Sequence, residues 1–389
     1  AGEVTAGWAH WMPGVAEQLA ELDAWEEVCR AAGASTAGLF KSPQPVTRGV
    51  DLDRPHRVLR LAGAKDWENI EFGSAAKRPE QIGDFVIKRA IGKGLGGGAV
   101  YLAQHFHTQE KVAVKWPLPA EELGMWTRVQ EQLPGCMGLP QLFDSGMHEG
   151  EPYAVTQLLG ADLTKVIQRF DPWDRLRRWR GVRVLGRMVL RRLEALHSAG
   201  IVHCDVSPYN VLLGRPGGGG CEDVVPYIID FGLARSWPGS GPLGAEHGTA
   251  EFASVRAAEG RERRPEDDLE ALGWTMVWLL LGDLPWCEWQ FEMKVHLELV
   301  ARIRAAKLRI LQEGWWKLRS LEPRWAMLAD IPVELSSFMK TSNSLSTRPT
   351  PPPDYRLLAA LLGGRRGLSA EEAEREDLRE FRAHVWPML

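Results

Sequence analysis

Two kinds of hydrophobic pattern follow each other along most of the chain. The first consists of short runs rich in valine, isoleucine and aromatic residues, at Phe85 to Ile91, Ala99 to Gln104 and Lys111 to Trp116. Runs of this length and composition are typical of neighbouring antiparallel strands. The spacing of apolar residues then predicts a helix over Ala120 to Leu133, and Tyr153 to Leu159 returns to the pattern of a strand.

The second pattern begins beyond Asp162, where long helical periods are broken by short loops. The chain is therefore expected to form an α+β fold of two lobes, a small β-rich lobe followed by a larger helical lobe. Its most apolar segment, Leu272 to Leu281, is about half the ~20 residues needed to cross a bilayer, so it predicts a buried helix and no membrane insertion. Trp274, Trp278 and Trp286 are expected in the core.

The first part of the chain, residues 1–80, reads as a separate N-terminal extension and linker. Val15 to Ala32 has apolar residues at helical spacing, which predicts one amphipathic helix. The simpler interpretation is an extension packed on the main domain, and a partner-binding or autoinhibitory segment is the alternative. Proline and glycine in Ser42 to Pro55 and in Gly73 to Pro79 indicate loops.

Composition narrows the functional classes. The 389 residues are 44% hydrophobic and 25% charged, which is ordinary for a globular protein. A net charge of −4 argues against general binding of polyanions, so nucleic acid is not an expected partner. The five cysteines are scattered and lack Cys-x-x-Cys spacing, and no segment has the pattern of a signal peptide. We therefore expect a reducing, intracellular location, in the cytoplasm or the nucleus.

A glycine-rich stretch, Gly92 to Gly98, joins the first two predicted main strands. Glycine there lets backbone amides approach phosphate oxygens without a Cβ in the way. Glycine-rich turns are common, so by itself the stretch indicates only a hairpin. Two further residues point to a nucleotide: Val100 is placed to pack over a purine, and Lys115 ends the third strand, where its ammonium could pair with the α and β phosphates.

A second group of residues carries the chemistry of phosphate transfer. Asp205 is the candidate base, because a carboxylate near an acceptor hydroxyl can orient it and take its proton. Asn210 and Asp230 offer an amide oxygen and a carboxylate, which suit Mg²⁺. Aspartate and asparagine at this spacing often occur by chance. His203 two residues before the first aspartate, and Gly232 completing Asp-Phe-Gly after an apolar strand, make the combination specific.

In this order the motifs resemble those of the eukaryotic protein kinases, and within them the casein kinase 1 and vaccinia-related kinase group. The resemblance is strongest over Gly248 to Ser254, Glu266 to Gly273 and Leu284 to Trp286, and Pro353 to Tyr355 looks like the start of the group's final helix. It covers roughly residues 81–363, the expected kinase domain, and leaves 364–389 as a helical tail. It implies a bilobal protein-kinase-like fold, ATP and Mg²⁺ as cofactors, and serine or threonine of a protein as substrate.

The resemblance also assigns roles to individual residues. Asp268 would brace the catalytic loop through its backbone, with His203 and Gly232 as further structural support. Thr156 would be the gatekeeper beside a hinge that contacts adenine. The ATP site would be formed by Ile91, Gly92, Gly94, Gly96, Gly97, Val100, Ala113, Lys115, Thr156, Gln157 and Leu159.

Several positions depart from the family pattern. Cys204 replaces the arginine that reads a phosphorylated activation loop, so control by such phosphorylation is not expected. Ser207 takes the catalytic place of the lysine that contacts the γ-phosphate, and this leaves a pseudokinase scaffold or a small-molecule phosphotransferase as alternatives. Counting without gaps places Trp126 where the lysine-pairing glutamate belongs, and Glu122, one turn earlier, is the candidate for that role. Glu251 replaces an arginine used for phosphate-primed substrates, so that preference is not carried over.

An arginine-rich segment, Arg175 to Arg192, contains eight arginines. Most are expected on the solvated face of the first long helix of the helical lobe, and a docking surface for an acidic partner is the alternative.

Overall fold

The computed structural model describes residues 79–93, 98–171, 174–215, 224–293, 295–314, 331–346 and 353–388. The chain divides into two compact units, residues 1–61 and 62–389, and all described residues belong to the second. The predicted N-terminal helix and the predicted phosphate-binding Gly94, Gly96 and Gly97 lie outside the described residues.

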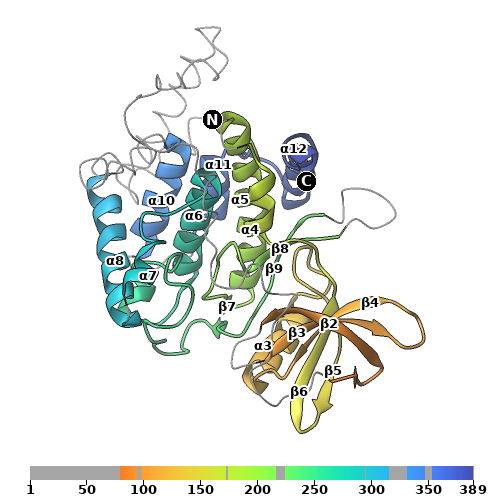
Figure 1. Ribbon diagram of the computed structural model, residues 1–389. Helices are drawn as coiled ribbons and strands as arrows, with labels where there is room; N and C mark the ends of the chain where they lie inside the picture. Colours follow the sequence, from red (N-terminus) through yellow and green to blue (C-terminus); the bar gives the residue numbers. More distant parts are fainter. Residues whose placement is uncertain are drawn as a thin grey trace, which may run out of the picture. The chain divides into compact units, whose positions relative to one another are not determined.

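One antiparallel sheet forms the β-rich lobe, with strand order β1-β2-β3-β4-β6-β5 (Figure 1). Alternate residues of β3 are buried, as expected of a strand that presents one face to a core. That core includes Ile87, Ala103, Val114 and Val155. The strands are β1 (Gln81–Ile82), β2 (Phe85–Lys93), β3 (Ala99–His105), β4 (Lys111–Trp116), β5 (Leu142–His148) and β6 (Glu151–Gln157).

Sequence reasoning found every strand of this sheet except β1 and β5. β5 was missed because it is an edge strand with hardly any buried residues, so its sequence, Leu-Phe-Asp-Ser-Gly-Met-His, lacks a clear hydrophobic alternation. Helix α3 (Ala120–Gln132) lies where it was predicted and contacts β5 and β6. It buries Glu122, Trp126 and Val129, which share one face at spacings of four and three residues.

The helical lobe is built around α6, which is buried along nearly its whole length and packs between α5 and α10. Trp274 and Trp286 are fully buried and pack edge to face, which confirms that these tryptophans belong to the core. The helices are α4 (Leu163–Val166), α5 (Arg175–Ser198), α6 (Pro265–Leu281), α7 (Trp289–Glu292), α8 (His296–Glu313), α10 (Val333–Ser346), α11 (Tyr355–Leu361) and α12 (Ala370–His384).

Short elements complete the described part of the lobe. Strand β7 pairs with β10 and β8 pairs with β9, and each of these pairs brings together segments that flank the loops carrying the predicted catalytic residues. Their bounds are Ile201–Val202, Val211–Leu213, Pro226–Ile228 and Arg235–Ser236 for β7 to β10, with 3₁₀ turns at Ile167–Arg169, Ala257–Glu259 and Trp386–Met388. Among the described residues, no helix combines the length and apolar character that a membrane span requires.

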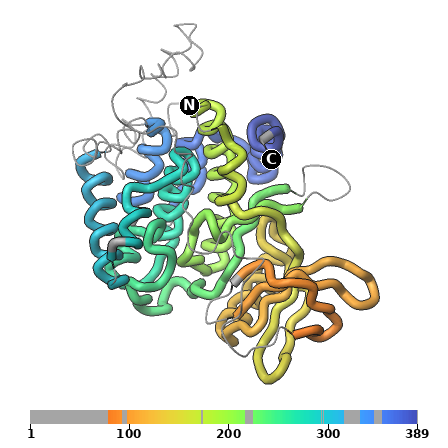
Figure 2. Tube along the Cα trace, viewed as in Figure 1, coloured from red at the N-terminus to blue at the C-terminus, as the bar shows by residue number. Residues whose placement is uncertain are grey.

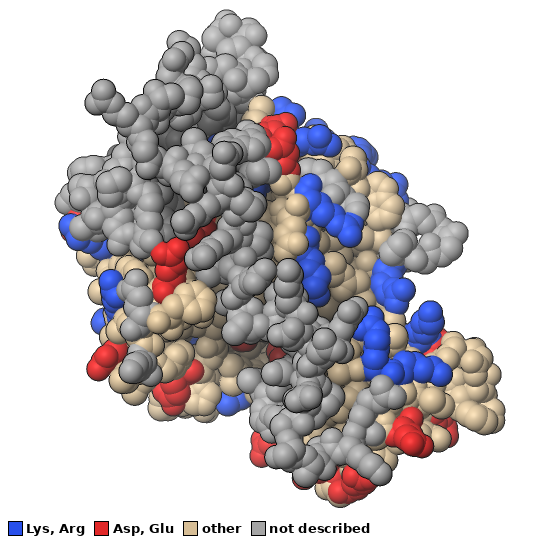
Figure 3. Space-filling model, viewed as in Figure 1, with Lys and Arg blue, Asp and Glu red and all other residues tan. Residues whose placement is uncertain are grey.

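The position of helix α12 shows that the arginine-rich segment is less solvated than predicted. The helix lies alongside α5 (Figure 2), so that Arg187 and Arg192 are buried rather than solvated. Arg178 is buried as well, and its Nε donates to the Leu279 carbonyl of α6 at 2.8 Å. Arg187 Nε lies 2.7 Å from an oxygen of Asp377, which also pairs with Arg191, and Arg192 donates to Glu374 at 2.8 Å. These acidic residues stand far along the chain, so no local pattern around α5 reveals them. Basic side chains remain visible on the surface between α12 and the sheet (Figure 3).

The ion pairs of Asp377 should be important for stability. Asp377→Asn removes the carboxylate charge but keeps the size of the side chain, so the buried guanidinium of Arg187 loses its nearest counter-charge. We expect the free energy of unfolding to fall by about 3 kcal/mol, as measured by urea denaturation.

Glu376→Gln, on the same helix, is the matched control. Glu376 pairs at 3.3 Å with Arg365, whose side chain is 71% exposed, so its loss should change stability by less than about 1 kcal/mol. Equal losses in the two variants would contradict a special role for the buried pair.

Candidate active site

The loop between β7 and β8 carries the predicted base and is held by a side chain of α6. Asp268, only 1% exposed, accepts hydrogen bonds from the backbone N–H of His203 at 2.7 Å and from that of Cys204 at 2.9 Å. Cys204 has a left-handed backbone, with φ of 69°, which an L residue adopts only with support from its surroundings. The buried carboxylate therefore fixes the path of the chain directly before Asp205.

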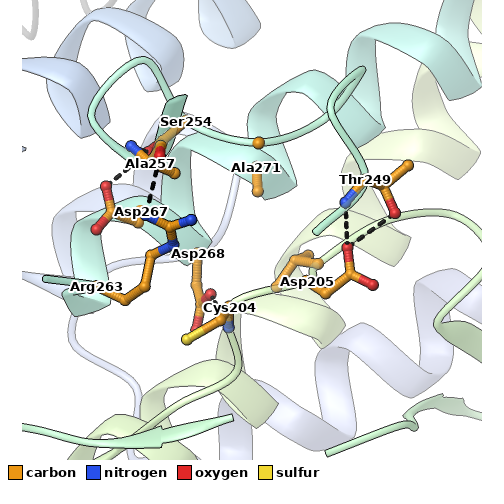
Figure 4. Close-up of a pocket in the computed structure, with 11 residues that line it drawn as sticks. Cys204, Asp205, Thr249, Ser254, Ala257, Arg263, Asp267, Asp268 and Ala271 are labelled. Atoms are coloured by element: carbon orange, nitrogen blue, oxygen red, sulfur yellow. Dashed lines mark hydrogen bonds between the residues drawn. The ribbon is translucent and has the colours of Figure 1, made fainter. Parts of the chain in front are cut away.

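The side chain of Asp205 is held by two elements. Its Oδ1 accepts hydrogen bonds from the N–H and from the hydroxyl of Thr249, both at 2.8 Å (Figure 4). Its Oδ2 accepts from Nδ2 of Asn210 at 2.8 Å, and the same amide nitrogen donates to the Asp205 carbonyl at 2.9 Å. Because both amide hydrogens of Asn210 are used in this way, its side-chain oxygen is the atom left to face a ligand.

The loop that carries Asp230 is tied by hydrogen bonds to the loop that carries Asp205. The N–H of Ile229 donates to the Asn210 carbonyl at 3.0 Å, and Nε2 of His203 lies 2.9 Å from the Ile229 carbonyl. Asp230 has a φ of 67°, and its Oδ1 accepts from the N–H of Gly232 at 3.2 Å. These contacts bring Asp205, Asn210 and Asp230 together although the last two are 20 positions apart.

Lys115 reaches the same place from β4. Its Nζ lies 3.1 Å from Oδ1 of Asp230 and forms a buried ion pair with Glu122 of α3. Burial alone would lower the pKa of Lys115, but Asp230 and Glu122 outweigh it, so the net direction is upward and the amine stays charged. The ammonium group of Lys115 therefore connects β4 with α3 and with the loop that carries Asp230.

The lysine-pairing carboxylate is Glu122 and not the residue at the gap-free position, Trp126. Trp126 instead packs edge to face on Phe231, the residue after Asp230, with ring centroids 5.8 Å apart. Both side chains point to the same side of α3 because they are four residues apart. Counting from a distant motif misplaces the glutamate by one turn, since the length of the loop after α3 is not fixed by the helix.

The remaining predicted nucleotide-binding residues lie in the sheet. In the register of the strands Gly92 pairs with Val100, and Ala113 pairs with Thr156. Ile91 belongs to β2, Gln157 ends β6, and Leu159 follows it. Gly98 has a different function from the one expected of the glycine-rich stretch: a Cβ there would collide with the Pro117 carbonyl, so glycine is required for packing.

The structure shows the environment of Ser207 and Cys204, two residues that depart from the family pattern. Ser207 is fully buried, and its hydroxyl has no hydrogen-bond partner among the described residues, so it does not replace a lysine ammonium. Burial raises the pKa of Cys204 well above its usual value, so the thiol stays neutral. Near Cys204, the buried guanidinium of Arg263 donates to the carbonyl of Ala257 at 2.9 Å (Figure 4). It also donates to the carbonyl of Gly244 at 3.2 Å.

The oxygen donors present suit Mg²⁺ and a polyphosphate. Asp230 and Asn210 offer hard oxygen atoms, and Lys115 offers a fixed cation beside them. Within the described residues, no three His, Cys, Asp or Glu side chains converge as a metal cage. A small protein ligand set of this kind matches the way Mg²⁺ is held when phosphates complete its coordination.

Comparison with known proteins agrees with this geometry. Residues 85–350, more than half of the chain, match the family model described as protein kinase domain. This chain belongs to the protein kinase family. It is 26% identical over 318 residues to casein kinase I homolog 1 of Schizosaccharomyces pombe, covering 78% of this chain and 64% of that protein. It is 30% identical over 220 residues to a probable casein kinase I homolog of Encephalitozoon cuniculi, covering 54% of this chain and 66% of that protein.

The predicted resemblance to the casein kinase 1 group is thus confirmed, and so is the bilobal α+β fold. The chain spans just under two thirds of the length of both relatives. Sequence reasoning missed one residue of the kinase site, Thr249. It stands in the Gly-Thr-Ala-Glu-Phe-Ala-Ser stretch used to identify the family, but the sequence gives no sign that it reaches Asp205, 44 positions away.

Replacing Glu122 tests the charge network around Lys115. Because Glu122 helps to raise the pKa of Lys115, Glu122→Gln should lower it, whereas Glu121→Gln on the exposed side of the same helix should leave it unchanged. An NMR titration of the ¹³C-labelled lysine side chains, with Lys115 assigned by Lys115→Arg, measures the shift. An unchanged pKa in Glu122→Gln would show that the pair does not form in solution.

Proposed function

We propose that this chain is an ATP-dependent protein kinase that transfers the γ-phosphate of ATP to a serine or threonine hydroxyl of a protein. The observation that carries the proposal is the meeting of four groups from separate segments: Lys115, Asp205, Asn210 and Asp230. Each has the chemistry that phosphoryl transfer requires at that place. We assign the kinase domain to residues 81–363.

In this proposal Asp205 acts on the acceptor. Its carboxylate is oriented by Thr249 and Asn210, so it presents a fixed oxygen to an incoming hydroxyl, orients it and takes its proton as the new phosphorus–oxygen bond forms. The backbone contacts of Asp268 keep the loop in place without using any side chain of the acceptor site.

The other residues act on the donor. When bound, Mg²⁺ and ATP supply the phosphoryl group and neutralise its charge. Asn210 and Asp230 would hold the metal through their oxygens, and Lys115 would pair with the α and β phosphates. The ion pair with Glu122 holds the ammonium at the end of β4, so its charge is already in place before the nucleotide arrives.

A protein acceptor is supported by the relatives, both named as casein kinase I homologs. No described contact favours the small-molecule alternative. Since Ser207 supplies no charge and Cys204 cannot bind a phosphate, we propose that the rate is set without activation-loop phosphorylation and with Lys115 as the main cation at the phosphates.

Asp205→Asn tests the catalytic role. The variant should lose phosphate transfer by about 10²- to 10⁴-fold, because the amide cannot take a proton, while ATP affinity stays within about twofold. Transfer is measured with labelled ATP, Mg²⁺ and casein, and affinity by calorimetry. Turnover equal to that of the parent protein would remove Asp205 from the mechanism.

Two controls complete this experiment. Asp84→Asn, at an exposed turn of the sheet, should leave transfer unchanged, and Asp230→Ala should abolish it by removing a metal ligand.

A panel of peptides and metabolites offered as acceptors separates the protein kinase from a small-molecule phosphotransferase. Absence of transfer to every acceptor by the parent protein would favour the pseudokinase.

A further inference from the structure

Helix α8 places a charged residue under the segment that contacts Asp205. Lys307 is 1% exposed, and its Nζ donates to the carbonyls of Ala253 at 2.5 Å and Ala250 at 3.2 Å. The ammonium also lies over the rings of Trp274 and Trp286, at 5.3 and 5.2 Å from their centroids. The side chain of Lys307 is thus enclosed by the core of the helical lobe, and its hydrogen bonds among the described residues go to the backbone of residues 250–253.

The same segment is anchored at further points from α6. Oε1 of Glu270 accepts from the N–H of Val255 at 2.9 Å, and the hydroxyl of Ser254 donates to Asp267 at 2.6 Å. From this anchored part the chain leads back to Thr249, which donates twice to Asp205. The residue directly after Thr249, Ala250, is held by Lys307, and the carbonyl of the next residue, Glu251, accepts a hydrogen bond from Trp286 at 3.0 Å.

A buried lysine is energetically unfavourable compared with an apolar residue in the same core position. Taking an ammonium out of water costs several kcal/mol, and an apolar side chain of similar volume is often as stable or more so. Methionine at this position would fill the space but would leave the carbonyls of Ala250 and Ala253 without their donor. The presence of lysine therefore indicates a need for those two hydrogen bonds, and they hold the segment that positions Thr249.

We propose that Lys307 is a positioning residue for phosphoryl transfer, which fixes Thr249 against Asp205 by holding the Ala250 and Ala253 carbonyls. The inference rests on the proposed kinase activity and adds a residue from outside the nucleotide site. Lys307 touches neither ATP nor the acceptor, so its effect falls on the rate of transfer and not on the affinity for ATP.

The charge state of Lys307 gives this role a pH dependence. Burial lowers the pKa of Lys307 to about 7, opposed by Glu270 of α6, Glu251 of the anchored segment and Cys287 after α6. The charged amine is present below that pH, and as the pH rises through it the attraction to Glu270 and to the two tryptophan rings is lost. The transfer rate of the parent protein should therefore fall as the pH rises through about 7.

The experiment compares Lys307→Met with Ile303→Ala, a buried residue of the same helix whose apolar side chain cannot donate a hydrogen bond to the segment's carbonyls. Lys307→Met should lower kcat by about tenfold or more and leave the KM for ATP within about twofold. It should also speed amide hydrogen exchange at Thr249 and Val255. Ile303→Ala, at a similar loss of Tm, should keep kcat within about twofold and leave exchange at these amides unchanged.

Two further variants test the route and provide a rescue. Combined with Thr249→Val, Lys307→Met should lower kcat by less than the product of the two single losses, because both act on one contact. Lys307→Arg keeps a cation and its donors at every pH used, so it should restore most of kcat and abolish the fall above pH 7.

Unchanged kcat and exchange in Lys307→Met, or equal effects of Ile303→Ala at equal Tm, would overturn the inference. If the parent protein transfers no phosphate, the proposed function fails. Hydrogen exchange at Thr249 and Val255 still decides whether Lys307 holds the segment, so the two failures are distinguishable.

Discussion

A buried carboxylate, Asp268, holds the site together. It stands on the central helix α6 and accepts the two backbone N–H groups that precede the predicted base, at His203 and Cys204. His197 of α5 lies against the same carboxylate, with Nε2 2.9 Å from Oδ2. Since an unpaired buried carboxylate would be costly, these partners and the carboxylate require each other, and the loop has one stable path.

From this anchor two chains of contacts extend through the candidate site. One leads from the catalytic loop through Ile229 to Asp230 and on to Lys115 and Glu122, so that sheet and helical lobe meet at one ion-paired cluster. The other leads from Asp205 to Thr249 and the segment anchored by Lys307. The residues proposed to act on ATP and those proposed to act on the acceptor are thus held by different contacts, and the loop of Asp205 belongs to both sets.

The C-terminal helix shows the same principle away from the site. α12 supplies the carboxylates that compensate the arginines of α5, and Asp377 alone serves both Arg187 and Arg191. The predicted helical tail thus packs on α5, which leads directly into β7 and the loop that carries Asp205. A basic helix that looks like a docking surface can therefore have its acidic partner within its own chain.

The sequence by itself determined the chemical groups of the site and most of the secondary structure. Hydrophobic alternation is a local property, so β2, β3, β4, β6 and α3 were predicted, whereas the exposed edge strand β5 was not. Tertiary structure decided the partners. It selected Glu122 over Trp126, joined Thr249 to Asp205, and paired Arg187 with Asp377 across 190 positions. These pairings depend on which side chains meet in space. A buried charge needs an oppositely charged partner, but the local sequence does not show where along the chain that partner stands.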